Sequence, residues 1–202
     1  MTNKLFIFII LSVSLTSCSL LYPLNTQVDE FKHTKKITLD VSEVPTEYIT
    51  SNVISTNITF EKSISESGET LNAYFVLKRN SSSFKLDKDC FIKASENSYK
   101  ITIENQETEI KSRLESKSES LSVKDSTKVK TQSKTVSSSY DWYEEKFIIP
   151  FTPEMVESIK NTKELIFRFY LGPKQATFRL KGTPLKRLKE NVINAKDAQK
   201  GL

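Results

Sequence analysis

Segments in which apolar and polar residues alternate recur along this chain from residue 37 to residue 180. Alternation with a period of two places the apolar side chains on one face of a β-strand, so each segment predicts a half-buried strand. The apolar residues that share a face are Ile37, Leu39 and Val41; Ile54, Ile58 and Phe60; Ala73, Phe75 and Leu77; Cys90, Ile92 and Ala94; Tyr99, Ile101 and Ile103; Leu165, Phe167, Phe169 and Leu171; and Ala176, Phe178 and Leu180.

Clusters of polar residues separate the early strands, for example residues 79–83 and 95–98, and such clusters are typical of turns. Short strands at this spacing indicate an antiparallel sandwich or barrel. We therefore predict a mainly β chain, with a single antiparallel β-sandwich-like domain over residues 36–202.

Two short helices interrupt this pattern. Thr152 can cap a helix that has Pro153 in its first position, which is where proline is favoured. Residues 184–194 predict a C-terminal helix, in which Leu185, Leu188, Val192 and Ile193 form an apolar stripe. The stripe is narrow, so we expect it to dock on the sheet rather than to lie on a membrane surface.

The middle of the chain alternates hydroxyl and charged residues instead of apolar and polar ones. Serines occupy the even positions 112, 116, 118, 120 and 122, and hydroxyl residues occupy the odd positions from Thr131 to Ser139. This period of two predicts a long polar β-hairpin over residues 111–139, with its turn near Asp125. The alternative for the same residues is a disordered loop rich in serine and lysine.

The N-terminus has the pattern of an export signal. Lys4 precedes an apolar run over residues 5–11, which is too short to cross a bilayer as a permanent helix. The signal ends in Leu15-Thr16-Ser17-Cys18, an aliphatic residue followed by two small residues and a cysteine.

These four residues resemble the lipobox of bacterial lipoproteins, a resemblance confined to the first 18 residues. It implies a signal peptide at 1–17, removal of that peptide, and a Cys18 that carries diacylglycerol and a further acyl chain such as palmitate. No other cofactor is expected. Residues 18–35 are then predicted to be a tether between the lipid and the fold.

The resemblance also implies an address. The chain would be anchored in the cell envelope of a bacterium, and Ser19 in place of an aspartate favours the outer membrane. The formal net charge of +5 and the pI of about 9.0 could suggest a nucleic-acid partner. An exported protein seldom meets nucleic acid, so attraction to anionic lipid headgroups is the better interpretation.

Few residues offer catalytic or metal-binding chemistry. The only histidine, His33, falls in the predicted tether, which argues against a hydrolytic triad. Cys90 is the second of two cysteines and alternates with apolar residues, as a core residue does. The chain has no Cys/His cluster for zinc, and its four glycines form no phosphate-binding loop.

Two groups of acidic residues are candidate sites, but we expect both to be solvated surface charge. Asp87 and Asp89 could offer oxygens to calcium, and Asp141, Glu144 and Glu145 could act on a polysaccharide. Neither group repeats a known calcium loop.

The densest aromatic segment, residues 141–147, contains Trp142 and Tyr143. Such residues more often belong to a core, but with nearby carboxylates they can also bind sugars or a protein. Arg168 projects from the face of its strand opposite to the apolar residues. Trp142, Tyr143 and Arg168 are therefore the candidate partner-binding residues.

From these observations we expect a non-enzymatic, lipid-anchored envelope protein that binds a protein or a cell-wall component. The alternatives are a hydrolase or lyase on envelope polysaccharide, which would use carboxylates such as Asp141, Glu144 and Glu145, and an adhesin at the cell surface.

Overall fold

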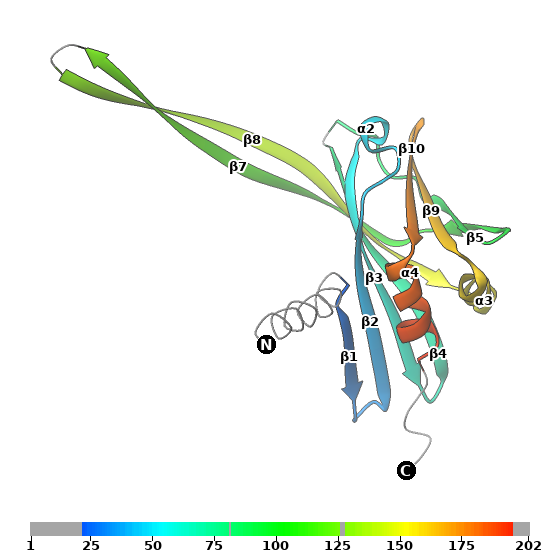
Figure 1. Ribbon diagram of the computed structural model, residues 1–202. Helices are drawn as coiled ribbons and strands as arrows, with labels where there is room; N and C mark the ends of the chain where they lie inside the picture. Colours follow the sequence, from blue (N-terminus) through cyan, green and yellow to red (C-terminus); the bar gives the residue numbers. More distant parts are fainter. Residues whose placement is uncertain (1–21, 81, 126–127, 196–202) are drawn as a thin grey trace, which may run out of the picture.

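The structure is a computed structural model that describes residues 22–80, 82–125 and 128–195. Two antiparallel sheets pack face to face, and one pair of strands projects far beyond them (Figure 1). The prediction of a mainly β, sandwich-like single domain with a long polar hairpin is confirmed.

The larger sheet has six strands in the order β1-β2-β3-β4-β8-β7. Strands that are consecutive in the sequence and adjacent in this sheet pair antiparallel, as β3 does with β4, and β8 returns to pair with β4 as well. The strands are β1 (Leu24–Asp29), β2 (Thr34–Glu43), β3 (Val53–Ser65), β4 (Gly68–Asn80), β7 (Glu104–Asp125) and β8 (Lys128–Phe151).

The smaller sheet has four strands in the order β10-β9-β5-β6. The chain passes from this sheet to the larger one at Ile103, a buried residue that connects β6 to β7 in the sequence. The strands are β5 (Asp89–Ala94), β6 (Asn97–Thr102), β9 (Glu164–Leu171) and β10 (Lys174–Lys181).

Phenylalanines fill the space between the sheets. Phe75 of the larger sheet stacks on Phe147 with ring centroids 5.0 Å apart, and both rings meet the edge or face of Phe169 from the smaller sheet at 5.3 Å. Aromatic side chains bury large areas and prefer such tilted contacts. The high phenylalanine content therefore serves the core.

The apolar faces predicted for the strands are buried or, at Tyr99 and Ile101, partly buried against the core, with one exception. In β3 a register shift between Val53 and Ser55 lets Val53 enter the core, while Ile54 is only half-buried. A β-bulge adds one residue to a strand and so reverses the alternation beyond it. The placement of Ile54 on the face of Ile58 and Phe60 is therefore wrong.

Three helical segments close the two ends of the sandwich. The helix α3 (Pro153–Asn161) begins as expected, with the Thr152 hydroxyl accepting a hydrogen bond from the Met155 N–H at 3.3 Å. The short α4 (Thr183–Arg187) continues into the π-helix η2 (Leu188–Ile193), and its N-cap is Gly182. The third, α2 (Tyr48–Ser51), was not predicted.

The predicted C-terminal helix docks on the larger sheet. Its apolar residues Leu185, Leu188, Val192 and Ile193 are all buried, and η2 packs against β2 and β3. Among the described residues, no helix is both long and apolar enough to span a membrane.

The fold begins earlier than the sequence pattern predicts. The strand β1 pairs along its whole length with β2, so residues 24–35 belong to the sheet, and the prediction of a tether as far as residue 35 is wrong. This edge strand is almost entirely exposed and shows little apolar alternation, which explains the error. His33 lies in the turn between β1 and β2.

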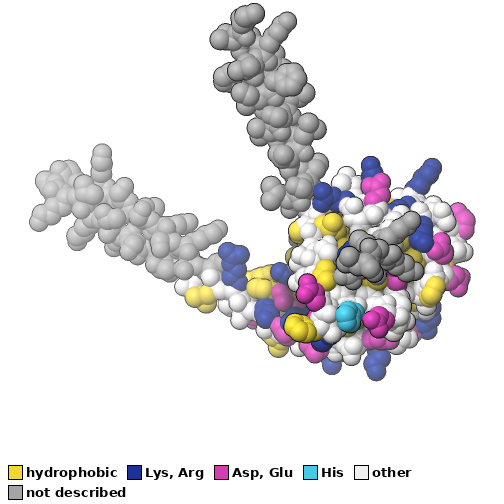
Figure 2. Space-filling view, turned by 90° about the horizontal axis from the view of Figure 1, so that it is seen from below, with side chains coloured by type: hydrophobic (Ala, Val, Ile, Leu, Met, Phe, Trp, Pro, Cys, Tyr) yellow, Lys and Arg dark blue, Asp and Glu magenta, His cyan; other side chains and the backbone are white. Residues whose placement is uncertain are grey.

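That turn lies at the end of the sandwich seen in Figure 2. Lysines and arginines alternate there with aspartates and glutamates, and neither sign gathers into a broad patch. Mixed charge of this kind keeps a protein surface soluble without attracting one particular partner.

The projecting strands β7 and β8 form an antiparallel ribbon. The prediction of a hairpin is therefore confirmed, and the alternative of a disordered loop is not. The pairing of these strands extends past residues 111–139 to Glu104 and Ile148 at the base; residues 126–127, next to the predicted turn, lie outside the described residues. The backbone register sets hydroxyl residues opposite one another: Ser116 and Ser137, Ser118 and Thr135, Ser120 and Ser133, and Ser122 and Thr131.

Candidate binding surfaces

The three residues predicted to bind a partner do not come together. Trp142 lies on the outer face of the six-stranded sheet, where the ribbon leaves the sandwich. Tyr143 is next in the strand and so points to the opposite face. Arg168 lies on the outer face of the four-stranded sheet.

Trp142 and Tyr143 are half-buried and do not belong to the core between the sheets. The expectation that they pack into the core is wrong, because this part of β8 is already at the margin of the sandwich. The core position in the segment belongs to Phe147.

On the inner face, the root of the ribbon is held by a buried ion pair between Arg79 of β4 and Glu145 of β8. Arg79 Nε donates to Glu145 Oε1 at 2.8 Å, and Arg79 Nη2 lies 2.6 Å from the same oxygen. The other carboxylate oxygen, Oε2, accepts from the hydroxyl of Thr108 in β7 at 2.6 Å and from the amide of Gln106 at 3.5 Å.

The rest of the Arg79 side chain is also satisfied. Its Nη1 donates to the Ser83 hydroxyl at 2.9 Å, and its guanidinium lies 4.2 Å from the centroid of the Tyr143 ring. This network joins β4, β7, β8 and the loop after β4. We call it the root cluster; it consists of Arg79, Ser83, Gln106, Thr108, Tyr143 and Glu145.

On the outer face, two aromatic rings lie side by side at the same root. Tyr140 and Trp142 have ring centroids 6.0 Å apart, and the ammonium of Lys78 lies 5.9 Å from the Trp142 ring. The Trp142 indole N–H donates to Glu144 Oε1 at 3.1 Å, which fixes the ring. A cation next to an aromatic face adds to the stability of such a surface.

Next to these rings, Glu109 of β7 lies directly opposite Glu144 of β8. Two lysines bind Glu109: Lys111 Nζ is 2.7 Å and Lys146 Nζ is 2.5 Å from its carboxylate oxygens. Hydrogen bonds from Lys111 and then from Lys146 lower the pKa of Glu109 to about 2. The lysines therefore offset the repulsion between the two facing carboxylates.

The carboxylates that could have served a hydrolase do not converge. Glu144 and Glu145 are consecutive in β8 and point to opposite faces, and Glu145 is committed to Arg79. Across the part of the chain that the structure describes, no group of three or more histidine, cysteine, aspartate or glutamate side chains could hold a metal ion.

Cys90 lies in the core, as predicted from its place on the same strand face as Ile92. Burial, together with the neighbouring Asp89 charge, raises the pKa of its thiol to about 12. A thiol of this kind is a poor nucleophile at neutral pH.

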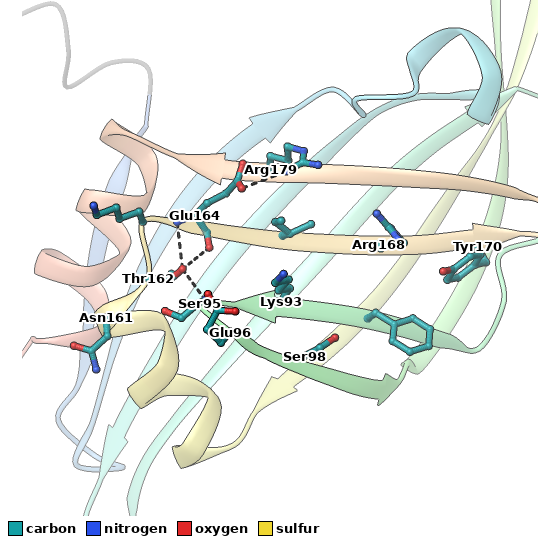
Figure 3. A pocket seen from close by; sticks show the side chains of 13 residues that line it. Lys93, Ser95, Glu96, Ser98, Asn161, Thr162, Glu164, Arg168, Tyr170 and Arg179 are labelled. Atoms are coloured by element: carbon teal, nitrogen blue, oxygen red, sulfur yellow. Dashed lines mark hydrogen bonds and ion pairs between the residues drawn. The ribbon is translucent and has the colours of Figure 1, made fainter.

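An open groove of about 820 Å³ lies on the outer face of the four-stranded sheet (Figure 3). We call it the outer groove; its floor consists of Phe91, Lys93, Ile166, Arg168 and Tyr170. Alternation within β5 and β9 explains this floor, because the neighbours of these residues in sequence are buried in the core.

One end of the outer groove is closed by its own hydrogen bonds. The Thr162 hydroxyl accepts from the backbone N–H groups of Ser95 at 2.9 Å and Glu164 at 3.2 Å. The Glu164 carboxylate is paired with Arg179 of β10 at 3.2 Å, and Figure 3 shows Thr162 and Ser95 next to the end of α3. The Thr162 hydroxyl and the Glu164 carboxylate are therefore already occupied by partners within the chain.

The middle of the groove differs, because its cations have no acidic partner. Arg168 Nε donates to the Thr177 hydroxyl at 3.3 Å, and within the described ranges neither Arg168 nor Lys93 forms an ion pair. Beside Arg168, the rings of Phe91 and Tyr170 meet edge to face at 5.9 Å.

The sequence held a signal for the root cluster that the initial interpretation missed. Arg79 continues the buried positions Ala73, Phe75 and Leu77 of β4, and Glu145 precedes the buried Phe147 in the same phase of β8. A charged residue in the buried phase of a strand needs a partner, so the two opposite charges were candidates for a pair.

No family model, no curated protein and no solved structure matches this chain. The class of protein is therefore defined by the fold alone: a two-sheet β-sandwich-like domain with a projecting two-stranded ribbon.

Proposed function

We propose that this chain is a lipid-anchored cell-envelope protein that binds a protein partner through its ribbon, in an assembly role rather than a catalytic one. The observation that carries the proposal is the isolation of the ribbon. The last residue of β4, Asn80, lies opposite Trp142, so residues 112–125 and 128–141 pair only with each other. At about 3.3 Å per residue, this part extends about 45 Å.

A two-stranded ribbon of this length has little stability of its own, because it has no second layer on which to bury a face. Near the root it exposes two large aliphatic side chains, Ile110 at 68% and Leu114 at 72%. These residues alternate on one face of β7, where a partner would cover them. Binding would thus supply the missing layer.

Both edges of the ribbon also have free backbone groups beyond the root. An extended segment of another protein can add to such an edge and gain main-chain hydrogen bonds. Lysines and glutamates along the same strands oppose unspecific edge-to-edge association. The combination favours one complementary partner over self-association.

The anchor is proposed from the lipobox resemblance at Cys18. Only Ser19, Leu20 and Leu21 stand between that cysteine and Tyr22, where the described fold begins. Four residues span at most about 14 Å, so an acylated Cys18 would hold the sandwich close to the bilayer. Two or more acyl chains anchor a protein stably. The outer membrane is the proposed location.

The ribbon can be removed without disturbing the sandwich. Lys111 lies directly opposite Trp142, and Asp125 lies opposite Lys128. The two pairs are separated by an even number of residues along each strand, so both have the same type of cross-strand hydrogen bonding. An Asn-Gly turn can therefore join Lys111 to Trp142. Residues 112–141 are replaced by that turn. The root cluster stays intact, and the ribbonless variant is expected to fold.

The test is photo-crosslinking in living cells with probes at Leu114, Ser120 and Ser138, followed by mass spectrometry. One reproducible protein partner is expected from probes on the ribbon, and the ribbonless variant, probed at Lys36 on the sandwich, should no longer reach it. A probe at Lys36 in the full chain is the matched control. Equal capture of that partner by the ribbonless variant would refute a ribbon-mediated role.

The anchor is tested separately by Cys18→Ala, with labelling by a palmitate analogue as the readout. The unchanged chain should incorporate the label into the membrane fraction, whereas the variant should not. Labelling of the variant to the same extent would overturn the lipobox interpretation without bearing on the ribbon.

A further inference from the structure

The outer groove has the features of a second, independent site. Across the sheet, Phe91 lies opposite Arg168, which in turn lies opposite Thr177; the adjacent row consists of Lys93, Ile166 and Arg179. Lys93 and Arg168 are therefore diagonal neighbours on one face. Side chains in such positions reach each other, and like charges there repel.

The carboxylates of the groove do not relieve this repulsion. Two carboxylates line the groove, those of Glu96 and Glu164. Glu164 is paired with Arg179, and within the described ranges Glu96 forms no ion pair with Lys93 or Arg168. Arg168 lines the groove and donates from Nε to Thr177, and its terminal N–H groups make no hydrogen bond within the described residues (Figure 3). A guanidinium fork of this kind binds a carboxylate with two parallel hydrogen bonds.

The remaining lining indicates the rest of the ligand. Beside the cations lie the aromatic rings of Phe91 and Tyr170, and the walls carry the hydroxyls of Ser95 and Ser98. Aromatic faces next to hydroxyl groups suit a sugar ring, which has apolar C–H faces and many hydroxyls.

We propose that the outer groove binds an acidic oligosaccharide, with Arg168 and Lys93 holding the carboxylates of its uronic-acid units. Phe91 and Tyr170 pack against a sugar ring, and the hydroxyl-lined wall orients its neighbours. This site is separate from the ribbon, on the other sheet of the sandwich.

The test is calorimetric titration of the full chain in detergent with a trigalacturonate probe, and with maltotriose as its neutral counterpart. Binding of the acidic sugar alone is expected. Arg168→Gln should weaken that binding about tenfold, the order of one charge-assisted hydrogen bond. Arg168→Lys should lose part of it, because the charge remains but the fork does not.

Lys36→Gln is the matched control, since it removes the same charge from the six-stranded sheet and should leave binding unchanged. The ribbonless variant should also bind fully, which separates this site from the proposed function. No binding of trigalacturonate, or an equal effect of Lys36→Gln and Arg168→Gln, would overturn the proposal. Tighter binding of a polyglutamate peptide would assign the groove to acidic peptides instead.

Discussion

Arg79 and Glu145 form an ion pair 2.6 Å long at the point where the ribbon leaves the sandwich, and their side chains are 3% and 0% exposed. Removing two charges from water is costly. The cost is offset here by hydrogen bonds that Thr108 and Gln106 donate to Glu145, and by one that Arg79 donates to Ser83 in the loop after β4. The pair therefore fixes the ribbon strands to the sandwich at the margin of the core.

Removing one member of this pair should be strongly destabilising. Arg79→Met or Glu145→Leu leaves a buried charge without its partner, so each is expected to lower the free energy of unfolding by about 3–5 kcal/mol. Urea denaturation followed by circular dichroism measures this loss. The double variant should recover most of it, because no unpaired charge remains.

Lys100→Met and Asp89→Leu provide an exposed pair for comparison, because the two side chains are 60% and 44% exposed. Exposed ion pairs contribute little, so these changes should stay within about 1 kcal/mol. If the Arg79 and Glu145 variants lose no more than this, the pair does not stabilise the root.

Glu109 should make the ribbon root sensitive to acid. Because hydrogen bonds from Lys111 and Lys146 lower its pKa to about 2, the ionised form stabilises the folded state. That stabilisation is fully present above the ordinary pKa of about 4.5, and is lost as the pH falls from there towards 2. Glu109→Gln should melt at a lower temperature than the unchanged chain at pH 7.

The difference between the two melting temperatures should vanish near pH 2. The only tryptophan, Trp142, lies opposite Lys111 and provides a local fluorescence signal for the melting curves. Glu157→Gln, which removes an exposed carboxylate from α3, is the control. A Glu109→Gln curve that tracks the unchanged chain at every pH would count against this role.

Lys62 should stabilise the packing of the C-terminal helix on the larger sheet. It occupies a core-facing position of β3, its side chain is 6% exposed, and its Nζ donates to the carbonyls of Ile193 at 3.0 Å and Ala195 at 2.7 Å. Lys62→Met leaves these carbonyls without a donor. We expect a loss of about 2 kcal/mol, with faster amide hydrogen exchange across η2.

Lys186→Met tests whether this effect depends on position. Lys186 lies on α4, is well exposed and is 3.9 Å from Glu190, so its replacement should change stability by less than about 0.5 kcal/mol. Equal exchange rates across η2 in the Lys62 variant and the unchanged chain would contradict the assigned contact.

Cys90 should be inert in the folded protein. Burial raises the pKa of its thiol to about 12, so the thiolate is scarce at pH 8 and the sulfur is shielded as well. In a Cys18→Ser variant, Ellman's reagent should label Cys90 only after unfolding in urea. Rapid labelling without urea would show that the core opens at this strand.

Local alternation was sufficient to predict the strands that form the core. Phe75, Phe167 and Phe178 stand in period-two runs, and such runs are half-buried whichever strands they pair with. The cap at Thr152 and the apolar stripe of the last helix are also local, and both are as predicted. The polar ribbon followed from the same period, because both of its arms kept it.

Non-local features were missed. The strand β1 carries no apolar alternation, and only its backbone pairing with β2 makes it part of the sheet. The bulge at Val53 and Ser55 reverses a face, and no single residue type marks it. Of the candidate site residues, Arg168 was placed on the correct face, but the groove around it requires the register of β5 against β9.

The sequence by itself determined the β-rich class, the buried faces and the extended ribbon, because these depend on periodicity, and its short motif at Cys18 is the sole basis for the proposed lipid anchor. Tertiary structure alone decided that Arg79 meets Glu145, that Trp142 and Arg168 lie on different sheets, and that Lys93 lies diagonal to Arg168. Strand order and register bring residues distant in sequence together, and these depend on how whole faces pack rather than on any local pattern.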